Sequence, residues 1–277
     1  MPAETPKVKS IEALRRGIEV LEAIRAGGGL SLHALHGRTA LPKATLLRIL
    51  RTLEESGVVQ RRIADGFYLP RADTLAPPAA RREHLRLTEL AAPHLRALRR
   101  QLPWPSDIAV RDGAHMLVLE SNRPLSGLSV NRQVVGFRPH MLLSAMGRAY
   151  FAFCPADERA ALLRELAREA EQAPALAALL RPAAVERLLA DARRRGYGLR
   201  DPVHRGPDAD MAERFCAIAV PIQLGSGSGS GSGAVAGTLS CVWLTDVSSE
   251  QQIVATYLGP LQEAAAGIGR RLSEPDR

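Results

Sequence analysis

The sequence of 277 residues predicts an α+β protein organised in two parts. Before residue 103, several segments have apolar residues every three or four positions, as amphipathic helices do. Two short β-prone runs follow the third of these segments. After residue 103, apolar strand-like runs alternate with helical ones, which favours an antiparallel sheet flanked by helices. We therefore expect a flexible tail, a first domain, a connecting helix and a second domain, at residues 1–9, 10–72, 73–102 and 103–272.

The net charge of +8 is compatible with a nucleic-acid partner, but its distribution is more informative. Of the 37 basic residues, 34 are arginines, so a general arginine bias of the chain contributes to the total. Between residues 38 and 62, six basic residues stand against two acidic ones, a net charge of +4. The six are Arg38, Lys43, Arg48, Arg51, Arg61 and Arg62. This local excess favours a surface that faces phosphates.

Cysteine usage and hydropathy indicate a cytoplasmic protein. Cys154, Cys216 and Cys241 lie far apart and form no CxxC pair, so we expect free thiols in a reducing compartment. The first ten residues have no apolar core of the kind a signal peptide requires. Every apolar run falls short of the roughly 18 residues that a transmembrane helix requires, so no membrane segment is expected.

Residues 31–59 read as two short helices joined by a tight turn. Ser31 can cap the first helix, and Pro42 suits the beginning of the second. One stripe of the second helix is apolar, through Leu46, Ile49, Leu50 and Leu53. The opposite face is small and basic, through Ala44, Thr45, Arg48, Arg51 and Thr52. Such a helix suits the major groove of DNA, although a solvated face on an ordinary helix pair is an alternative explanation.

The segments on either side complete a pattern that an ordinary helix pair does not predict. Ser10 can cap a preceding helix with an apolar stripe at Ile11, Leu14, Ile18, Leu21 and Ile24. After the helix pair, residues 58–63 and 67–69 flank Ala64-Asp65-Gly66 and predict a hairpin, with Arg61 and Arg62 near its turn. Three helices and a basic hairpin form the order of a winged helix-turn-helix, so we expect a DNA-binding domain.

The second part combines strands and helices. A polar, arginine-rich helix is expected at 79–102, after Pro77-Pro78, with Pro93 as a potential kink. Strands are expected at 108–111, 116–120, 128–131, 216–223 and 235–244. Helices are expected at 144–153, 157–169, 183–195 and from 248 to about 272. Ser248 and Gln251 have the spacing of a capping box for the last of these.

Patterns typical of enzymes are weak or absent. The GSGSGSGSG tract at 225–233 has Ser230 where a dinucleotide-binding loop needs glycine, so a flexible connection is the better interpretation. His33 and His36 have a spacing that can bind a metal, but they lie inside the helix pair. Asp208 and Asp210 fall in a predicted solvated loop. We expect no catalytic residue, metal or cofactor, with an enzyme built on the second domain as the competing class.

These residues, taken together, resemble the IclR family of bacterial transcriptional regulators. The N-terminal resemblance consists of Lys9-Ser10, Arg16, Leu41-Pro42-Lys43-Ala44-Thr45, Arg48-x-Leu50-x-x-Leu53 and Gly66-Phe67-Tyr68-Leu69. The C-terminal resemblance consists of Ala145-Met146-Gly147-Arg148-Ala149, Gly196-Tyr197-Gly198, Ile218-Ala219-Val220-Pro221-Ile222 and Gly237-Thr238-Leu239-Ser240. Three further segments are similar to the family's regulators of aromatic-acid catabolism, namely Leu90-Ala91-Ala92-Pro93, Trp104-Pro105-Ser106-Asp107 and Phe151-Ala152-Phe153-Cys154-Pro155.

The resemblance implies a winged helix-turn-helix domain, a linker helix and a GAF-like effector-binding domain, assembled as a homodimer or homotetramer. Its recognition helix would run from residue 43 to 55 and contact a double-stranded DNA operator. Lys43, Ala44, Thr45 and Arg48 would face the major groove, where arginine reads guanine and a small side chain contacts the thymine methyl. Arg51 can reach bases or phosphates, whereas Arg61 and Arg62 on the wing would bind phosphate.

The effector pocket implied by the resemblance maps onto Leu128, Ala145, Met146 and Ser240. The family's frequent pocket cysteine and histidine are replaced here by Ala217 and Leu142, with Cys216 expected on the opposite side of its strand. A more apolar pocket favours an aromatic carboxylic acid over a small keto acid, which stays the alternative. Trp104 can stack on the ring or belong to the core, and Arg132 or Arg138 can pair with the carboxylate.

Overall fold

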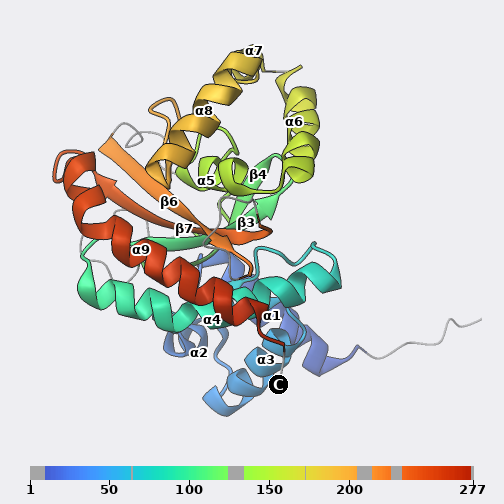
Figure 1. Ribbon diagram of the computed structural model, residues 1–277. Helices are drawn as coiled ribbons and strands as arrows, with labels where there is room; N and C mark the ends of the chain where they lie inside the picture. The colour runs from blue at the N-terminus through green and yellow to red at the C-terminus, as the bar shows by residue number, and fades with distance from the viewer. Residues whose placement is uncertain are drawn as a thin grey trace, which may run out of the picture. The chain divides into compact units, whose positions relative to one another are not determined.

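The computed structural model describes residues 10–63, 65–123, 134–171, 173–204, 214–225 and 233–275 (Figure 1). The chain forms two compact units, Met1–Thr74 and Leu75–Arg277. The first unit is a helix-turn-helix with a β-hairpin, and the second is an antiparallel sheet with helices. The predicted α+β fold class is therefore confirmed.

The first unit has the order of a winged helix-turn-helix. Its helices are α1 (Glu12–Ala26), α2 (Leu32–Thr39) and α3 (Lys43–Glu55), and its strands are β1 (Val59–Arg61) and β2 (Tyr68–Pro70). The two strands pair antiparallel, as predicted, with Gln60 opposite Leu69. Leu30, before α2, extends this ladder because it exchanges backbone hydrogen bonds of 3.0 and 2.9 Å with Tyr68. The wing is thereby attached to the start of the helix pair.

Two predicted helix caps have different outcomes in this unit. Ser31 caps α2 as expected, since its hydroxyl accepts a hydrogen bond of 3.1 Å from the Ala34 N–H. The prediction for Ser10 is wrong, because Ile11 is the residue before α1 and provides no side-chain cap. Glu12 replaces the cap electrostatically: a carboxylate in the first turn is favourable there, and this one pairs with Arg15 and Arg16.

The core of the first unit lies where its three helices meet the wing. Its buried members are Val20, Ile24, Leu30, Leu35, Leu46, Leu50, Val59 and Tyr68. Burial of each leucine contributes about 1.5–3 kcal/mol. In the predicted stripe of the first helix, however, Ile11, Leu14 and Ile18 are 68%, 60% and 48% exposed, so only the second half of this stripe reaches the core.

The second unit contains a five-stranded sheet in the order β4-β3-β7-β6-β5, with antiparallel neighbours throughout. Its strands are β3 (Ser106–Asp112), β4 (His115–Ser121), β5 (Gly198–Leu199), β6 (Phe215–Gln223) and β7 (Val235–Leu244). Its helices are α4 (Pro78–Gln101), α5 (Ala145–Phe153), α6 (Ala156–Ala170), α7 (Pro174–Leu179), α8 (Pro182–Arg195) and α9 (Glu250–Ser273). Helices α4 and α9 lie side by side along one face, and α5 packs on the other (Figure 1).

Helix α4 corresponds to the segment expected to connect two domains. It is continuous through Pro93, and the second unit buries its stripe of Leu87, Ala91, Leu95 and Leu98. It packs against α9 and β3. This helix consequently contributes its buried stripe to the core of the second unit.

Most predicted elements of the second unit are present, with differences at the cap of α9, at α7 and at the short strand β5, which was not predicted. The capping box of α9 uses Ser249 and Gln252 instead of Ser248 and Gln251: the Gln252 N–H donates to the Ser249 hydroxyl, and the Ser249 N–H donates to the Gln252 side chain. Because two serines and two glutamines are consecutive, both registers fit the pattern. Helix α7 was not predicted, and the strand expected at 128–131 lies outside the described residues. None of the described helices is long and apolar enough to cross a membrane.

Replacement of Gly269 by alanine should destabilise the second unit. A Cβ at this position in α9 would lie 2.1 Å from the backbone carbonyl oxygen of Gln223, which cannot move without breaking the sheet edge. We expect the free energy of unfolding to fall by about 1–3 kcal/mol. Gly17→Ala in α1 is the matched control, since nothing lies within 4 Å of its added Cβ, and it should stabilise its own unit by about 0.5–1 kcal/mol. Equal effects of the two substitutions in urea denaturation would contradict this packing.

Candidate functional site

The turn between α2 and α3 is fixed by side chains. His36 donates from Nδ1 to the Leu41 carbonyl at 2.8 Å, and the Thr39 hydroxyl donates to the Leu35 carbonyl at 2.8 Å. Ala40 adopts a left-handed conformation with φ of 55°, which brings α3 back across α2. His36 is thus a structural residue of the turn. Among the described residues, no group of three or more His, Cys, Asp or Glu is placed to hold a metal ion.

Helix α3 presents one face to solvent. Leu46 and Leu50 are buried, while Lys43, Ala44, Arg48 and Arg51 are exposed and Thr45 is half-buried. Leu47, which sequence reasoning missed, is also exposed and lies beside Arg48. Arg51 forms an exposed ion pair of 2.8 Å with Glu55. The geometry therefore offers a mixed basic and apolar surface, the combination that reads base edges and thymine methyl groups.

The two wing arginines have different environments. Arg61 is exposed, donates from Nε to the Gly66 carbonyl at 3.2 Å and lies 5.9 Å from the centroid of the Tyr68 ring. Arg62 is only 6% exposed, and its Nε and Nη2 donate to the Asp65 carboxylate at 2.9 and 2.6 Å. It also lies over the Phe67 ring. Arg62 therefore stabilises the wing from inside and is not exposed in the way that the predicted phosphate contact requires.

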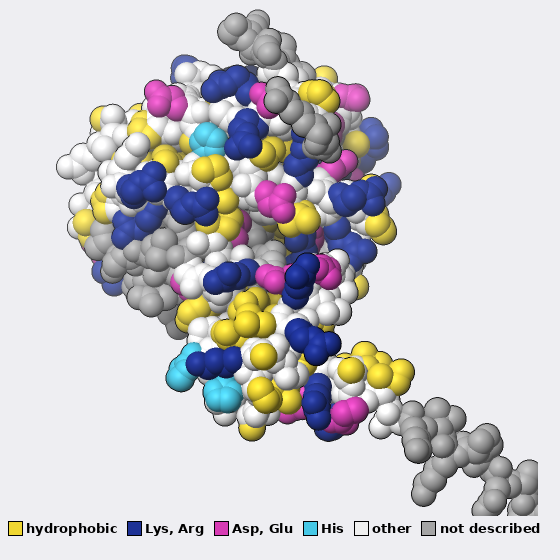
Figure 2. Space-filling view, turned by 90° about the horizontal axis from the view of Figure 1, so that it is seen from below, with side chains coloured by type: hydrophobic (Ala, Val, Ile, Leu, Met, Phe, Trp, Pro, Cys, Tyr) yellow, Lys and Arg dark blue, Asp and Glu magenta, His cyan; other side chains and the backbone are white. Residues whose placement is uncertain are grey.

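Basic side chains do not gather in a single patch on the face shown in Figure 2. Lys and Arg side chains there are interspersed with apolar, acidic and histidine side chains. The total charge therefore does not by itself mark a DNA-binding surface. The α3 face is distinguished instead by its local geometry, with basic and small side chains exposed opposite the buried Leu46 and Leu50.

The second unit contains a cavity of about 90 Å³ between the sheet and the start of α5. Three predicted pocket residues, Ala145, Met146 and Ser240, line it. Most of the remaining wall is apolar and is formed by Val118, Val134, Phe137, Pro139, Phe215, Ala217 and Val242. Its polar members, which sequence reasoning missed, are Asp107, Arg123, Ser144, Arg200 and His204.

Other predicted pocket residues lie elsewhere. Trp104 is buried in the core and does not line the cavity, and its backbone N–H donates to the hydroxyl of Tyr257 in α9 at 3.3 Å, which agrees with the core alternative for this residue. The Arg138 side chain is 56% exposed and pairs with Asp112 at 2.7 Å, so it does not face a ligand in the cavity. Leu128 and Arg132 lie outside the described residues.

The two departures from the family pattern also differ in their location. Ala217 lines the cavity and Cys216 does not, which confirms that consecutive residues of β6 face opposite sides. Leu142 is buried outside the cavity wall, and its N–H donates to His140 Nδ1 at 3.1 Å. Only the change at position 217 therefore alters the cavity surface directly.

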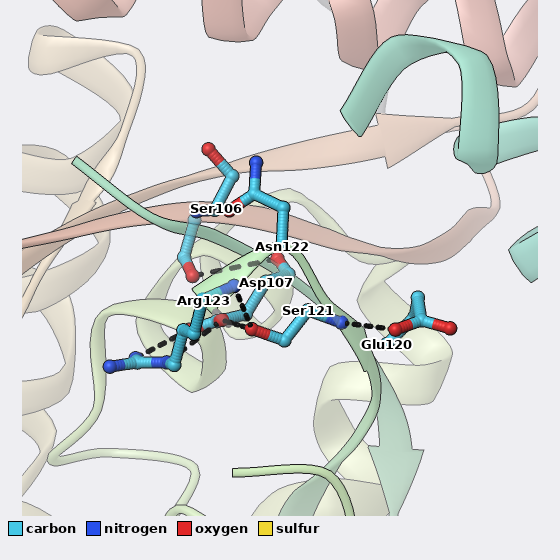
Figure 3. A network of polar contacts seen from close by, with 7 residues as sticks. Ser106, Asp107, Glu120, Ser121, Asn122 and Arg123 are labelled. Atoms are coloured by element: carbon cyan, nitrogen blue, oxygen red, sulfur yellow. Dashed lines mark hydrogen bonds and ion pairs between the residues drawn. The ribbon is translucent and has the colours of Figure 1, made fainter. Parts of the chain in front are cut away.

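An ion pair forms the polar end of the cavity (Figure 3). Asp107 on β3 is fully buried, and it accepts from Arg123 Nε at 3.0 Å and from Nη2 at 2.6 Å. The Ser121 hydroxyl donates to the same carboxylate at 2.6 Å. These side chains meet because Asp107 and Ser121 are opposite each other in the β3–β4 register. A polar run that ends β4 and continues beyond it, Glu120-Ser121-Asn122-Arg123, is the signal that could have identified this site.

The same polar run contacts α4. The Asn122 side chain accepts from the Ser106 N–H at 2.7 Å and donates to the Leu95 carbonyl at 3.1 Å. Glu120 accepts from the Ser121 N–H at 2.8 Å. Through Asn122, hydrogen bonds thus join the end of β4 to the start of β3 and to α4, the helix that begins the second unit.

His204 and Arg200 form another polar part of the wall. Burial lowers the pKa of His204 to about 4, so its imidazole is neutral at neutral pH. Burial also lowers the pKa of Arg200, but a guanidinium group remains protonated in proteins. Arg200 donates to the backbone carbonyls of Phe215 and His204. Arg200 is thus tied to the backbone of the wall, and the apolar chamber with the Arg123 guanidinium group in its other polar part suits a small organic anion.

A winged helix-turn-helix followed by a separate α+β unit defines a class of DNA-binding transcriptional regulators. Residues 13–62 match the model of the IclR helix-turn-helix domain. Residues 80–270 match that of the bacterial transcriptional regulator IclR C-terminal domain. The chain belongs to the IclR family, whose members are transcriptional regulators and not enzymes.

Individual relatives agree with this assignment. The chain is 26% identical to the transcriptional repressor IclR of Escherichia coli over 204 residues, 73% of each protein. It is 27% identical to the E. coli repressor YiaJ over 154 residues, which span only 55% of that relative's length. A crystal structure of an IclR regulator from Alicyclobacillus acidocaldarius has a TM-score of 0.53 at 21% identity and covers 96% of this chain and all of its own. One from Brucella abortus has a TM-score of 0.51 at 24% identity, with 96% and 94% covered.

Replacement of Arg62 by alanine should loosen the wing, whereas replacement of Arg61 should not. Arg62→Ala removes the two guanidinium donors from the Asp65 carboxylate and leaves it the Phe67 N–H, so we expect the wing to lose about 1–3 kcal/mol of stability. Arg61 is exposed, and Arg61→Ala should change stability by at most about 0.5 kcal/mol. Hydrogen exchange of the amides in residues 59–70 measures both. Unchanged exchange in Arg62→Ala would show that Arg62 does not brace the wing.

Proposed function

We propose that this regulator binds a specific DNA operator through α3 and the wing, and that a small-molecule effector controls this binding. It would act in the cytoplasm as a homodimer or homotetramer, so that paired α3 helices reach two half-sites. The observation that carries the DNA-binding proposal is the exposed face of α3, opposite the buried Leu46 and Leu50. The domain limits of 10–72 for reading DNA and 103–272 for binding the effector, with the helix between them as a linker, belong to this proposal.

The proposed roles follow from the chemistry of the exposed side chains. Arg48 reads a guanine edge, and Lys43, Ala44 and Thr45 flank it in the groove. Arg51 and Arg61 contact phosphates, which positions the protein without specifying sequence. Arg62 is omitted, because it is buried against Asp65.

For the effector we propose an aromatic carboxylic acid, as in regulators of aromatic-acid catabolism. The cavity wall is largely apolar and includes the phenylalanine side chains of Phe137 and Phe215. An apolar cavity of about 150 Å³ can hold a benzene ring. The cavity here is smaller, so a single ring enters it with a small outward shift of side chains.

The proposed mechanism is a shift between two arrangements of the assembled second units. An effector that binds one arrangement more tightly increases its population. The accompanying shift of the α4 helices then alters the distance between the two α3 helices that bind the paired half-sites. An effector with equal affinity for both arrangements would leave operator binding unchanged.

Binding to the DNA upstream of the regulator's own gene should depend steeply on salt. Each phosphate contact releases counterions, so the affinity should fall as the salt concentration rises. Arg48→Ala should weaken specific binding by about 10-fold or more at fixed salt, the usual cost of a lost base contact. Fluorescence anisotropy with a labelled duplex measures both quantities.

Arg187→Ala provides the control for this measurement. It removes an equal charge from an exposed position on α8, in the second unit, and should change the affinity by no more than about twofold. A flat salt response, or equal effects of the Arg48 and Arg187 substitutions, would contradict the proposed interface.

An aromatic carboxylic acid should stabilise the second unit. A ligand present at 100 times its dissociation constant adds about 2.7 kcal/mol to the free energy of unfolding. Thermal unfolding with benzoate, 4-hydroxybenzoate, phenylacetate and 3-phenylpropionate tests this, with pyruvate and glyoxylate for comparison. A shift with the two keto acids and none with the aromatic acids would reject the aromatic proposal and favour the keto-acid alternative.

A further inference from the structure

The side chain of Arg123 is placed where a cavity ligand can reach it. It lies two residues after the end of β4, is 8% exposed and lines the cavity wall. Its backbone N–H donates to the Ser121 hydroxyl at 3.1 Å. The same hydroxyl donates to Asp107, so the backbone and the side chain of Arg123 are held by one small network (Figure 3).

The ion pair uses only one edge of the guanidinium group. Nε and Nη2 face the two oxygens of Asp107. A guanidinium group carries five N–H donors in a planar fork, so a second edge remains, formed by Nη1 and the other hydrogen of Nη2. Among the described residues, Nη1 has no hydrogen-bond partner. This second edge can receive two oxygens in the end-on geometry that carboxylates adopt with arginine.

We propose that Arg123 is the specificity-determining residue of the cavity and receives the carboxylate of a monocarboxylic ligand on this second edge. The inference rests on the proposed effector role of the cavity. Asp107 acts as a positioning residue, because its buried carboxylate holds the guanidinium plane before the ligand arrives. A ligand that meets a preorganised donor loses less free energy to side-chain ordering.

The charge of the pair sets the class of ligand. Asp107 neutralises the charge of Arg123, and the second edge of the guanidinium group still offers directed N–H donors to one further carboxylate. A second carboxylate on the ligand would add negative charge close to Asp107, a repulsion that selects against dicarboxylates. The apolar remainder of the wall accepts the body of the molecule. The selected class is a monocarboxylic acid with an apolar, ring-sized body.

The other guanidinium group in the wall provides a matched control. Arg200 also lines the cavity, and it donates to the backbone carbonyls of Phe215 and His204. Lysine at either position keeps the charge but loses the planar fork. Arg123→Lys retains an ion pair with Asp107, and a role confined to stability would leave its ligand preference unchanged.

The test compares each acid with its neutral amide by isothermal titration. The probes are 4-hydroxybenzoate with 4-hydroxybenzamide, and phenylacetate with phenylacetamide. We expect wild type to prefer the acid by about 10- to 100-fold, the value of charge-assisted hydrogen bonds. In Arg123→Lys this preference should fall to within about threefold, and in Arg200→Lys it should persist.

Asp107→Asn supplies a second measurement, in which the relative affinity for a dicarboxylate should rise rather than fall. Loss of the negative charge should improve binding of terephthalate, a dicarboxylate, relative to 4-hydroxybenzoate, even if overall stability falls. General damage to the cavity would weaken both ligands equally.

The outcomes separate the two proposals. No binding of any probe to wild type would overturn the effector role and the Arg123 assignment together. A wild-type preference for acids that survives Arg123→Lys, or that is lost in Arg200→Lys instead, would overturn only the Arg123 assignment. An unchanged ratio of terephthalate to 4-hydroxybenzoate in Asp107→Asn would count against the role of Asp107.

Discussion

The buried ion pair between Asp107 and Arg123 is the contact on which the second unit's interior depends. A buried carboxylate without partners is strongly unfavourable, and this one is satisfied by Arg123 and Ser121. The pair fixes the end of β4 against the start of β3. From there Asn122 extends the hydrogen bonds to the Leu95 carbonyl of α4. The polar end of the cavity and the helix that begins the unit therefore share one framework.

On the opposite side of the cavity, at α5, neighbouring backbone segments are packed closely against one another. A Cβ on Gly198 would lie 2.4 Å from the Ala145 carbonyl oxygen, and one on Gly147 would lie 2.2 Å from the Met141 carbonyl oxygen. Arg148 donates to the carbonyls of Leu142 and Leu199 at 2.7 and 3.2 Å. The glycines and the arginine of the family-like motifs thus hold α5 tightly against β5. Their role is to keep the wall in place, while neighbouring side chains contact the cavity.

The first unit shows how burial assigns different roles to identical residue types. Arg61 and Arg62 are adjacent in the sequence, yet one is exposed and the other is enclosed with Asp65 and Phe67. Consecutive residues of an extended segment point to opposite sides, and the local sequence does not say which side is enclosed. The same limit applies to Trp104, whose apolar ring suits a ligand and a core equally well. Its burial away from the cavity follows from packing around α9, far along the chain.

The sequence by itself determined the elements that depend on local interactions. Apolar periodicity predicted α3, and short apolar runs predicted β3 and β4, because these patterns act between near neighbours. Only the tertiary structure decided which polar residues share the cavity. Asp107, Arg123 and Arg200 come from separate parts of the chain, and sheet register and burial bring them to one wall. Arg138 was predicted there and lies outside, since the energy of a polar contact depends on a partner that the sequence does not place.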